Sequence, residues 1–298
     1  MFGEFRNAFD RPNNAHVQLI IINVVIFLAM GIVYVLTNIT QHGEIFDAVL
    51  KQLAIPAKLS TFITKPWTLI THAFVHDMGG LFHVFGNMLF LYWFGTLIVE
   101  YLGNDKFVAL YVLGILGGAF AYLLFFNTIP FYVERNGAMA YGASAAVNAI
   151  LIGAATLLPD HVFYLLFLGP VKIKWIALFY VIGFFIGSVG SNAGGDIAHL
   201  GGALMGYLYI KQLQAGNDWG SWVTATLDWT KGLFKPSPKV KVTYRKSEPA
   251  RKTSAQGKQS FNKATQEEID AILDKISDKG YESLTKEEKE KLFNASKK

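Results

Sequence analysis

Long apolar runs alternate with short polar stretches over the first 213 residues of the chain. A helix needs roughly 20 apolar residues to cross the hydrocarbon core of a bilayer, and shorter runs suffice where neighbouring helices cover their ends. The pattern therefore predicts an all-α membrane protein, a bundle of six transmembrane helices. The six runs cover residues 17–36, 81–100, 106–126, 142–158, 173–189 and 197–213.

Polar stretches divide the rest of the chain. We expect residues 1–16 to form a cytosolic N-terminal segment, 17–213 the membrane domain, and 214–264 an interfacial and then basic, flexible linker. Between the first two runs, the long and partly apolar segment 37–80 is expected to be an external loop that dips into the outer leaflet.

Residues 265–298 predict a small cytosolic helical hairpin. Two Thr-x-x-Glu sequences, at 265–268 and 285–288, match capping boxes, and Gly280 is expected to end the first helix. Its isoleucines and leucine recur at helical spacing. The hairpin carries no catalytic constellation, so it either docks a cytosolic partner or forms a solvated tail.

Composition supports a membrane protein. The chain is 52% hydrophobic and 16% charged, with a mean hydropathy of +0.32, which is too apolar for an ordinary soluble domain. A net charge of +5 raises the question of nucleic acid, but 11 of the 27 Lys and Arg residues lie between Lys211 and Lys263, beside the last run. That placement favours a lipid bilayer, not nucleic acid, as the partner. The absence of cysteine excludes a thiol nucleophile.

The basic residues also predict an orientation. Arg6, Arg11, Lys106 and the basic tail lie together if both termini are cytoplasmic, which leaves the segment 37–80 outside. We therefore expect a multi-pass protein of the cell (plasma) membrane, of the bacterial inner-membrane type.

Four polar side chains interrupt the predicted spans. His83 and Asn87 lie four residues apart in the second, and so share one helix face. Ser144 opens the fourth span and His199 lies near the start of the sixth. Polar groups inside spans usually face the bundle interior or a water-filled cavity.

Each of these residues also has a packing explanation. Ser144 lies among small residues that let helices approach closely, and His199 is followed by Gly202 and Gly206, a GxxxG contact. His83 and Asn87 can simply hydrogen-bond between helices.

The common depth of these four residues favours a catalytic site over helix packing alone. The second, fourth and sixth spans all start at the same surface, so the four residues lie at one level, roughly 5 to 10 Å inside it. A serine becomes a nucleophile when an adjacent neutral histidine takes its proton. The free N–H groups of the first helical turn, with His83 and Asn87, can stabilise an oxyanion. The residues therefore predict acyl transfer at Ser144.

At these residues the chain resembles the rhomboid intramembrane serine proteases. The matching motifs are HVFGN at 83–87, GTLIVE at 95–100, GAS at 142–144 and AHLGGALMG at 198–206. The resemblance implies a Ser144–His199 dyad without a carboxylate, with His83, Asn87 and the Ser144 N–H as oxyanion hole. It also implies no cofactor, and single-pass transmembrane proteins as substrates.

Three positions depart from the family pattern. Thr68 replaces an arginine after Trp67, so the first loop must be fastened differently. Ala145 replaces a glycine, which we expect to narrow the space beside the oxyanion site. Asn148 replaces an aromatic ring, and we expect it to hydrogen-bond or orient His199.

Three classes of function remain open. The first is an intramembrane endopeptidase that cleaves substrates near the outer face. The second is an inactive relative that binds membrane proteins, which the retention of Ser144 and His199 disfavours. The third is a transporter, which the absence of a carboxylate at mid-membrane disfavours. No metal site is predicted, because His72, His76 and His83 lack further ligands at suitable spacing.

Overall fold

The structure is a computed structural model that describes residues 14–135, 138–166, 168–234 and 266–296. It divides into two compact units, Met1–Ser237 and Pro238–Lys298. Residues 1–13 of the predicted N-terminal segment, 235–264 of the predicted linker, and 265, 297 and 298 of the predicted hairpin lie outside the described residues.

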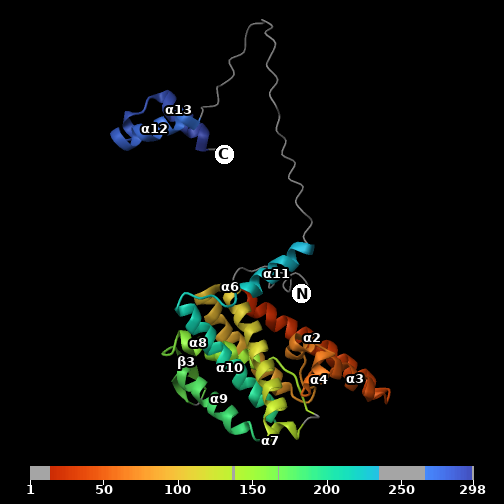
Figure 1. Ribbon diagram of the computed structural model, residues 1–298. Helices are drawn as coiled ribbons and strands as arrows, with labels where there is room; N and C mark the ends of the chain where they lie inside the picture. Colours follow the sequence, from red (N-terminus) through yellow and green to blue (C-terminus); the bar gives the residue numbers. More distant parts are fainter. Residues whose placement is uncertain (1–13, 136–137, 167, 235–265, 297–298) are drawn as a thin grey trace, which may run out of the picture. The chain divides into compact units, whose positions relative to one another are not determined.

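Helices make up most of the first unit (Figure 1). They coincide largely with the apolar runs, since a helix pairs its backbone N–H and C=O groups within one segment. In chain order they are α2 (Ala15–Ile39), α3 (Gly43–Leu53), α4 (Leu59–Ile63), α5 (Thr68–Thr71), the 3₁₀ turn η1 (His72–Phe74), α6 (Leu81–Thr128), α7 (Pro130–Val133), α8 (Ser144–Leu157), α9 (Ile173–Gly187), α10 (Ala193–Gln214) and α11 (Ser221–Phe234).

Two short antiparallel strand pairs depart from the all-α prediction. β1 (Ile55–Pro56) pairs with β2 (Met139–Ala140), and β3 (Val162–Leu165) pairs with β4 (Gly169–Lys172). The sequence did not reveal them, because strands of two to four residues are too short for a clear alternation of apolar and polar positions.

Gly103 divides α6 into two helices. Its φ of 82° and ψ of 173° are not helical, and this positive φ favours glycine, which has no Cβ. The parts on either side, 81–102 and 104–128, correspond to the predicted runs 81–100 and 106–126.

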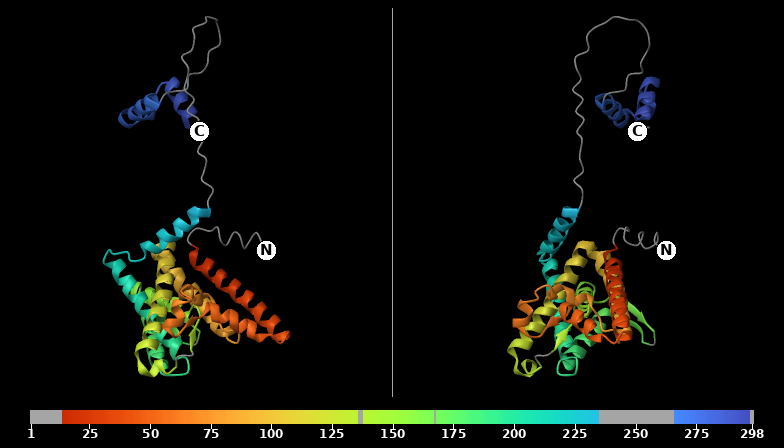
Figure 2. Two further views of the ribbon diagram at one scale, coloured as in Figure 1. Left: turned by 45° about the vertical axis from the view of Figure 1, so that its right-hand side comes forward. Right: turned by 90° about the vertical axis from the view of Figure 1, so that its right-hand side faces the viewer.

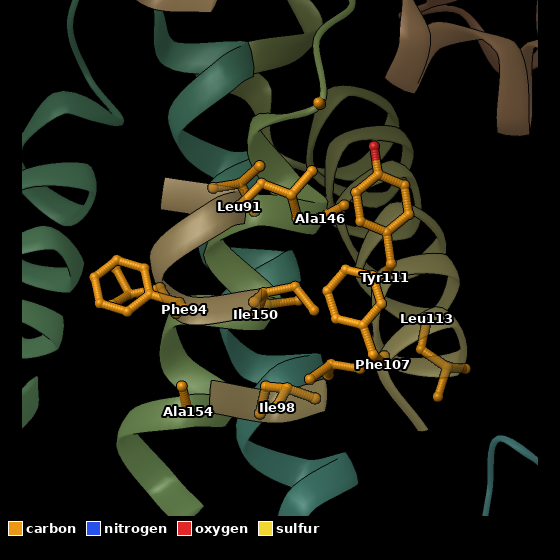
Figure 3. Close-up of a cluster of buried hydrophobic side chains, with 14 of the residues drawn as sticks. Leu91, Phe94, Ile98, Phe107, Tyr111, Leu113, Ala146, Ile150 and Ala154 are labelled. Carbon is orange, nitrogen blue, oxygen red and sulfur yellow. The ribbon is translucent and has the colours of Figure 1, made fainter. Parts of the chain in front are cut away.

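The two parts of α6, α8 and α10 pack against one another in the middle of the unit (Figure 1). Small residues of α8 let the large side chains of α6 approach its backbone, and these core side chains are at most 1% exposed. Figure 3 shows Leu91, Phe94, Ile98, Phe107 and Tyr111 of α6 with Ala146, Ile150 and Ala154 of α8.

α2 and α9 lie outside this core and expose apolar side chains. α2 runs along one side of the bundle in both views of Figure 2. Leu28 and Ile32 of α2 are 59% and 61% exposed, and Phe179 and Phe185 of α9 are 74% and 69% exposed. Such faces suit hydrocarbon better than water.

By length and composition, two helices in the described part of the chain can cross a membrane, α2 and α6. α8 and α9 are shorter apolar helices. This agrees with the prediction of a membrane protein.

Polar contacts attach α2 to α6. Asn23 is fully buried, and its Nδ2 donates to the Tyr111 hydroxyl at 3.2 Å and to the Leu19 carbonyl oxygen at 2.8 Å. At the start of α2, the Ala15 N–H donates to the Asn104 side chain at 3.1 Å. These bonds hold α2 at a defined position beside the core.

The segment 37–80, which we expected to be a loop, contains several short elements. It contains α3, β1, α4, α5 and η1, and side chains fasten it to its own backbone. Trp67 Nε1 donates to the Gln52 carbonyl oxygen at 2.8 Å, and Thr71 Oγ1 donates to that of Leu53 at 2.8 Å. Thr68, fully buried, donates to the Lys65 carbonyl oxygen at 2.7 Å. These bonds fasten the segment without an arginine at position 68.

The interfacial part of the predicted linker contains a helix, α11. Asp218 accepts hydrogen bonds from the Tyr209 hydroxyl at 3.1 Å and from the Gly220 N–H at 3.0 Å, and it pairs with Lys106 of α6. This network fixes the start of α11, so residues up to 234 continue the ordered bundle.

The second unit contains α12 (Gln266–Lys279), the 3₁₀ turn η2 (Tyr281–Ser283) and α13 (Lys286–Ser296). Its second capping box is confirmed: the Thr285 N–H donates to Glu288 at 2.7 Å, and the Glu288 N–H donates to Thr285 Oγ1 at 3.3 Å. Gly280 ends α12 with a φ of 77°, as predicted. Thr265, of the first capping box, lies outside the described residues.

Candidate active site

Ser144 is the first residue of α8, and two hydrogen bonds to the segment before α6 fix the turn that precedes it. Gly142 has a φ of 128°, which favours glycine, and its N–H donates to the His72 carbonyl oxygen at 2.8 Å. The Ala143 N–H donates to His76 Nε2 at 3.4 Å. The position of Ser144 is therefore set by η1 and the segment after it, as well as by α8 itself.

The His76 ring supports the start of α8. Burial, with the neighbouring charge of His83, lowers the pKa of His76 to about 4. The ring is therefore neutral near pH 7, and the ring nitrogen Nε2 can accept the bond from Ala143.

Glycines of α10 bring that helix against α8. A Cβ added at Gly202 would collide with the backbone carbonyl of Ala145, and one added at Gly206 would collide with that of Ala149. The packing explanation of the GxxxG sequence is therefore correct, and the close approach it allows also carries His199 to the start of α8.

Ser144 and His199 meet at this contact. Ser144 Oγ lies 2.6 Å from His199 Nε2, and the histidine is 6% exposed. A hydroxyl and an imidazole at this distance can exchange a proton, which is the requirement for nucleophilic catalysis at a serine.

Two further residues lie beside the imidazole, and neither was expected from the sequence. The Phe184 ring of α9 lies 4.5 Å from the His199 ring, between centroids, at an interplanar angle of 57°. Asp196 Oδ1 lies 3.6 Å from His199 Nδ1. The spacing of Asp196, three residues before His199 in a helix, was a signal that could have found it. Nothing in the sequence indicated Phe184.

His83 and Asn87 lie in the first two turns of α6. Asn87 is buried, and its Nδ2 has no hydrogen-bond partner among the described residues. His83 lies on the surface, close enough to His199 for their charges to interact. In the described part of the chain neither is hydrogen-bonded to Ser144.

Asn148 does not make the expected bond to His199. Its Nδ2 donates instead to the carbonyl oxygen of Ser144, one turn earlier in α8, at 2.8 Å. The ring that contacts His199 comes from Phe184 of another helix, so an aromatic neighbour is present although position 148 does not supply it.

We expected the Ala145 methyl group to narrow the space beside the oxyanion site, but it points toward α6 instead. A Cβ added at Gly118 of α6 would lie 2.5 Å from the Ala145 methyl group, so this methyl fills the interface between α8 and α6. Ala145 itself is 4% exposed.

Comparison with known proteins shows which family the chain belongs to. The model of the Rhomboid domain matches residues 64–214, just over half of the chain. The chain belongs to the rhomboid family. A second model, a family of unknown function (DUF6576), matches residues 259–298.

Curated rhomboid relatives are similar over the same region. RHOMBOID-like protein 12, mitochondrial, of Arabidopsis thaliana is 36% identical over 162 residues, 50% of this chain and 47% of that protein. Rhomboid protein 1, mitochondrial, of Saccharomyces cerevisiae is 32% identical over 158 residues, 50% of this chain and 42% of that protein. Presenilin-associated rhomboid-like protein, mitochondrial, of Rattus norvegicus is 33% identical over 138 residues, 44% of this chain and 34% of that protein. The chain therefore spans less than half the length of these relatives.

These relatives correct the expected location. The charge pattern led us to expect a bacterial plasma membrane with both termini cytoplasmic, whereas the relatives of this rhomboid are mitochondrial proteins by name. The expectation was wrong because Lys and Arg bias reports on the two sides of a membrane and carries no information about which membrane it is.

Proposed function

We propose that this rhomboid is an intramembrane serine endopeptidase that cleaves membrane-anchored proteins. The observation that carries the proposal is the 2.6 Å approach of Ser144 Oγ to His199 Nε2, from two helices whose starts are 49 residues apart. Packing alone explains the glycines of α10, but it does not explain why a hydroxyl and an imidazole meet where they do.

In this proposal Ser144 is the nucleophile and His199 is the general base and acid. His199 takes the Ser144 proton as the hydroxyl attacks the scissile carbonyl, and returns it to the leaving amine. A water then repeats the sequence on the acyl-enzyme and regenerates Ser144.

The oxyanion would be stabilised by the Ser144 N–H, His83 and Asn87. Ser144 starts α8, so its N–H belongs to the first turn, whose donors have no partner within the helix. The free, buried Nδ2 of Asn87 supports its role as a donor.

Six transmembrane helices form the proposed membrane domain, namely α2, the two parts of α6, α8, α9 and α10. The exposed apolar side chains of α2 and α9 support a position next to lipid. The mitochondrial names of the relatives favour a mitochondrial membrane.

Single-pass transmembrane proteins are the proposed substrates. Peptide bonds inside a helix are hydrogen-bonded, so a segment that unwinds readily near one membrane surface, with Gly or Pro beyond the cleaved bond, should be preferred. The hairpin of α12 and α13 is proposed to dock a protein partner, since no catalytic group distinguishes it.

A fluorophosphonate probe tests the function. We expect the full chain in detergent to be labelled, the Ser144→Ala variant to lose labelling completely, and a Ser60→Ala variant, at an exposed serine, to be labelled like wild type. Equal labelling of Ser144→Ala and wild type would contradict the proposal. Absence of labelling in all three, with no cleavage of unstable transmembrane segments, would indicate an inactive relative.

A further inference from the structure

We propose that Asp196 is a positioning residue for His199, a carboxylate that orients the imidazole while Ser144 and His199 remain the two reacting groups. The inference rests on the proposed protease function. It departs from the expectation drawn from the sequence, which placed no carboxylate in the site.

The Asp196 carboxylate lies beside Nδ1 of His199, the ring nitrogen that does not face Ser144. Nε2 of His199 faces Ser144 at 2.6 Å, and Nδ1, at the other side of the ring, faces Asp196 Oδ1 at 3.6 Å. The side chains of His199 and Asp196 are 8% and 14% exposed, so little water lies around them. Nδ1 is buried and has no hydrogen-bond partner among the described residues.

The distance of 3.6 Å is just longer than a hydrogen bond. Such contacts are often long in the free enzyme and shorten in the complex with substrate. Because Asp196 and His199 lie one turn apart on the same helix, a small change of side-chain torsion closes the gap without moving the backbone.

A second helix holds the carboxylate in place. A Cβ added at Gly187, the last residue of α9, would lie 2.5 Å from Asp196 Oδ2. The carboxylate therefore fills the space that any other residue at position 187 would need. Phe184, one turn earlier in α9, contacts the His199 ring, so the same helix restrains both members of the pair.

The chemistry follows from which ring nitrogen carries the proton. A carboxylate beside Nδ1 favours the tautomer with Nδ1–H, which leaves the lone pair of Nε2 free to accept the Ser144 proton. When that proton arrives, the ring becomes positively charged and the adjacent carboxylate stabilises that charge.

The other groups beside the His199 ring do not stabilise a positive charge on it. α8 contributes the neutral Ser144, and α9 contributes Phe184. His83 of α6 is within electrostatic range, but when protonated it would oppose a positive charge on His199. Asp77 acts electrostatically on His83, and among the described residues the carboxylate at ion-pair distance from His199 is Asp196.

Asp196 could also serve only the helix, because an acidic residue in the first turn interacts favourably with the helix dipole. The two roles differ in their effects. A purely structural role changes stability, whereas a positioning role changes the tautomer of His199 and the rate of the chemical step.

The test compares full-length wild type, Asp196→Asn, Asp196→Glu and Ser144→Ala in detergent. A fluorescent fluorophosphonate gives the maximal labelling rate and the half-saturating probe concentration, and ¹⁵N NMR of histidine-labelled protein gives the tautomer. His199→Gln assigns the His199 signals.

For Asp196→Asn we expect the maximal labelling rate to fall about 10- to 100-fold with the half-saturating concentration unchanged, since an amide can donate to Nδ1 and favour the wrong tautomer. The His199 signals should move toward the Nε2–H form. Asp196→Glu, which keeps the carboxylate, should recover part of the rate.

A matched glycine pair on α9 provides an independent test if Asp196→Asn folds poorly. Gly187→Ala pushes a methyl group against the carboxylate, whereas a Cβ at Gly183 of the same helix meets nothing within 4 Å. We expect Gly187→Ala to slow labelling and Gly183→Ala to leave it unchanged. Gly187→Ala should add nothing in the Asp196→Asn background.

The experiment distinguishes failure of the proposed protease function from failure of the proposed role of Asp196. If wild type is not labelled, or Ser144→Ala is labelled equally, the proposed function itself fails. If Ser144→Ala loses labelling while Asp196→Asn keeps the wild-type rate and tautomer, the protease proposal stands and the role of Asp196 is overturned. A fall in melting temperature of Asp196→Asn with an unchanged labelling rate would also overturn it.

Discussion

Gly202 of α10 lies directly against the backbone carbonyl of Ala145 in α8, closer than any side chain would permit. Ala145 follows the candidate nucleophile and Gly202 follows His199 by three residues, so this contact sets the separation of the two reacting groups. Helices approach this closely in membranes where small residues replace side chains at the interface.

Gly202→Ala should therefore separate Ser144 from His199. We expect a loss of about 1–3 kcal/mol in unfolding free energy from overpacking, and a fall in fluorophosphonate labelling rate of at least about 10-fold because proton transfer requires close contact. Thermal unfolding and labelling kinetics measure the two effects. Gly183→Ala is the control, since its Cβ would meet no neighbour. Labelling of Gly202→Ala at the wild-type rate would show that the contact does not determine the site.

Phe184→Ala should loosen the His199 ring. Phe184 packs against the imidazole at 4.5 Å, and without it the ring gains rotational freedom and water gains access. We expect the labelling rate to fall about 10-fold, with a small decrease in melting temperature. Phe185→Ala removes a neighbouring ring that is 69% exposed, and should leave the rate unchanged. Equal effects of the two substitutions would refute a specific role of Phe184.

Tyr111→Phe should weaken the attachment of α2 while leaving the site intact. The substitution removes the hydroxyl that accepts from Asn23 at 3.2 Å, in a fully buried position. We expect a loss of about 1 kcal/mol, as for a single interhelical hydrogen bond, and an unchanged labelling rate per folded molecule. Tyr101→Phe, at a tyrosine that is 56% exposed, should change neither quantity. If Tyr111→Phe melts like wild type, the bond contributes nothing.

The second unit should lose stability in acid through Glu288. Its carboxylate is 2.8 and 2.9 Å from Lys275 Nζ and accepts from the Thr285 N–H, and these bonds lower the pKa of Glu288 to about 2. Because the folded-state pKa lies below the unfolded value of about 4.3, the contribution is complete above that value and is lost as the pH falls through about 2.

Amide hydrogen exchange of α13 in the full chain, measured between about pH 5 and pH 2 and corrected for intrinsic rates, reports this loss. Glu288→Gln should remove the pH dependence in this window, and Glu287→Gln, at an exposed neighbour, should retain it. Protection that is equally pH-dependent in Glu288→Gln would assign the effect to another carboxylate.

Much of the fold follows from patterns that a sequence can carry. The apolar runs predicted the long helices, including the division of α6 near Gly103, because the length of an apolar run reflects the thickness of the bilayer core. The second capping box and the glycine end of α12 were also predicted, since they depend on residues only a few positions apart. The short helices of 37–80 and the strand pairs were missed, because they are stabilised by contacts with distant segments.

For the candidate site, the sequence by itself determined that His83, Asn87, Ser144 and His199 lie near the starts of their helices, because distance along a helix axis is proportional to residue number. Only the tertiary structure decided the surroundings: Asp196 and Phe184 beside His199, Asn148 bonded within its own helix, and the Ala145 methyl group against Gly118. These depend on the rotation of each helix about its axis and on which neighbour packs beside it, and packing contacts between residues far apart in the chain determine both.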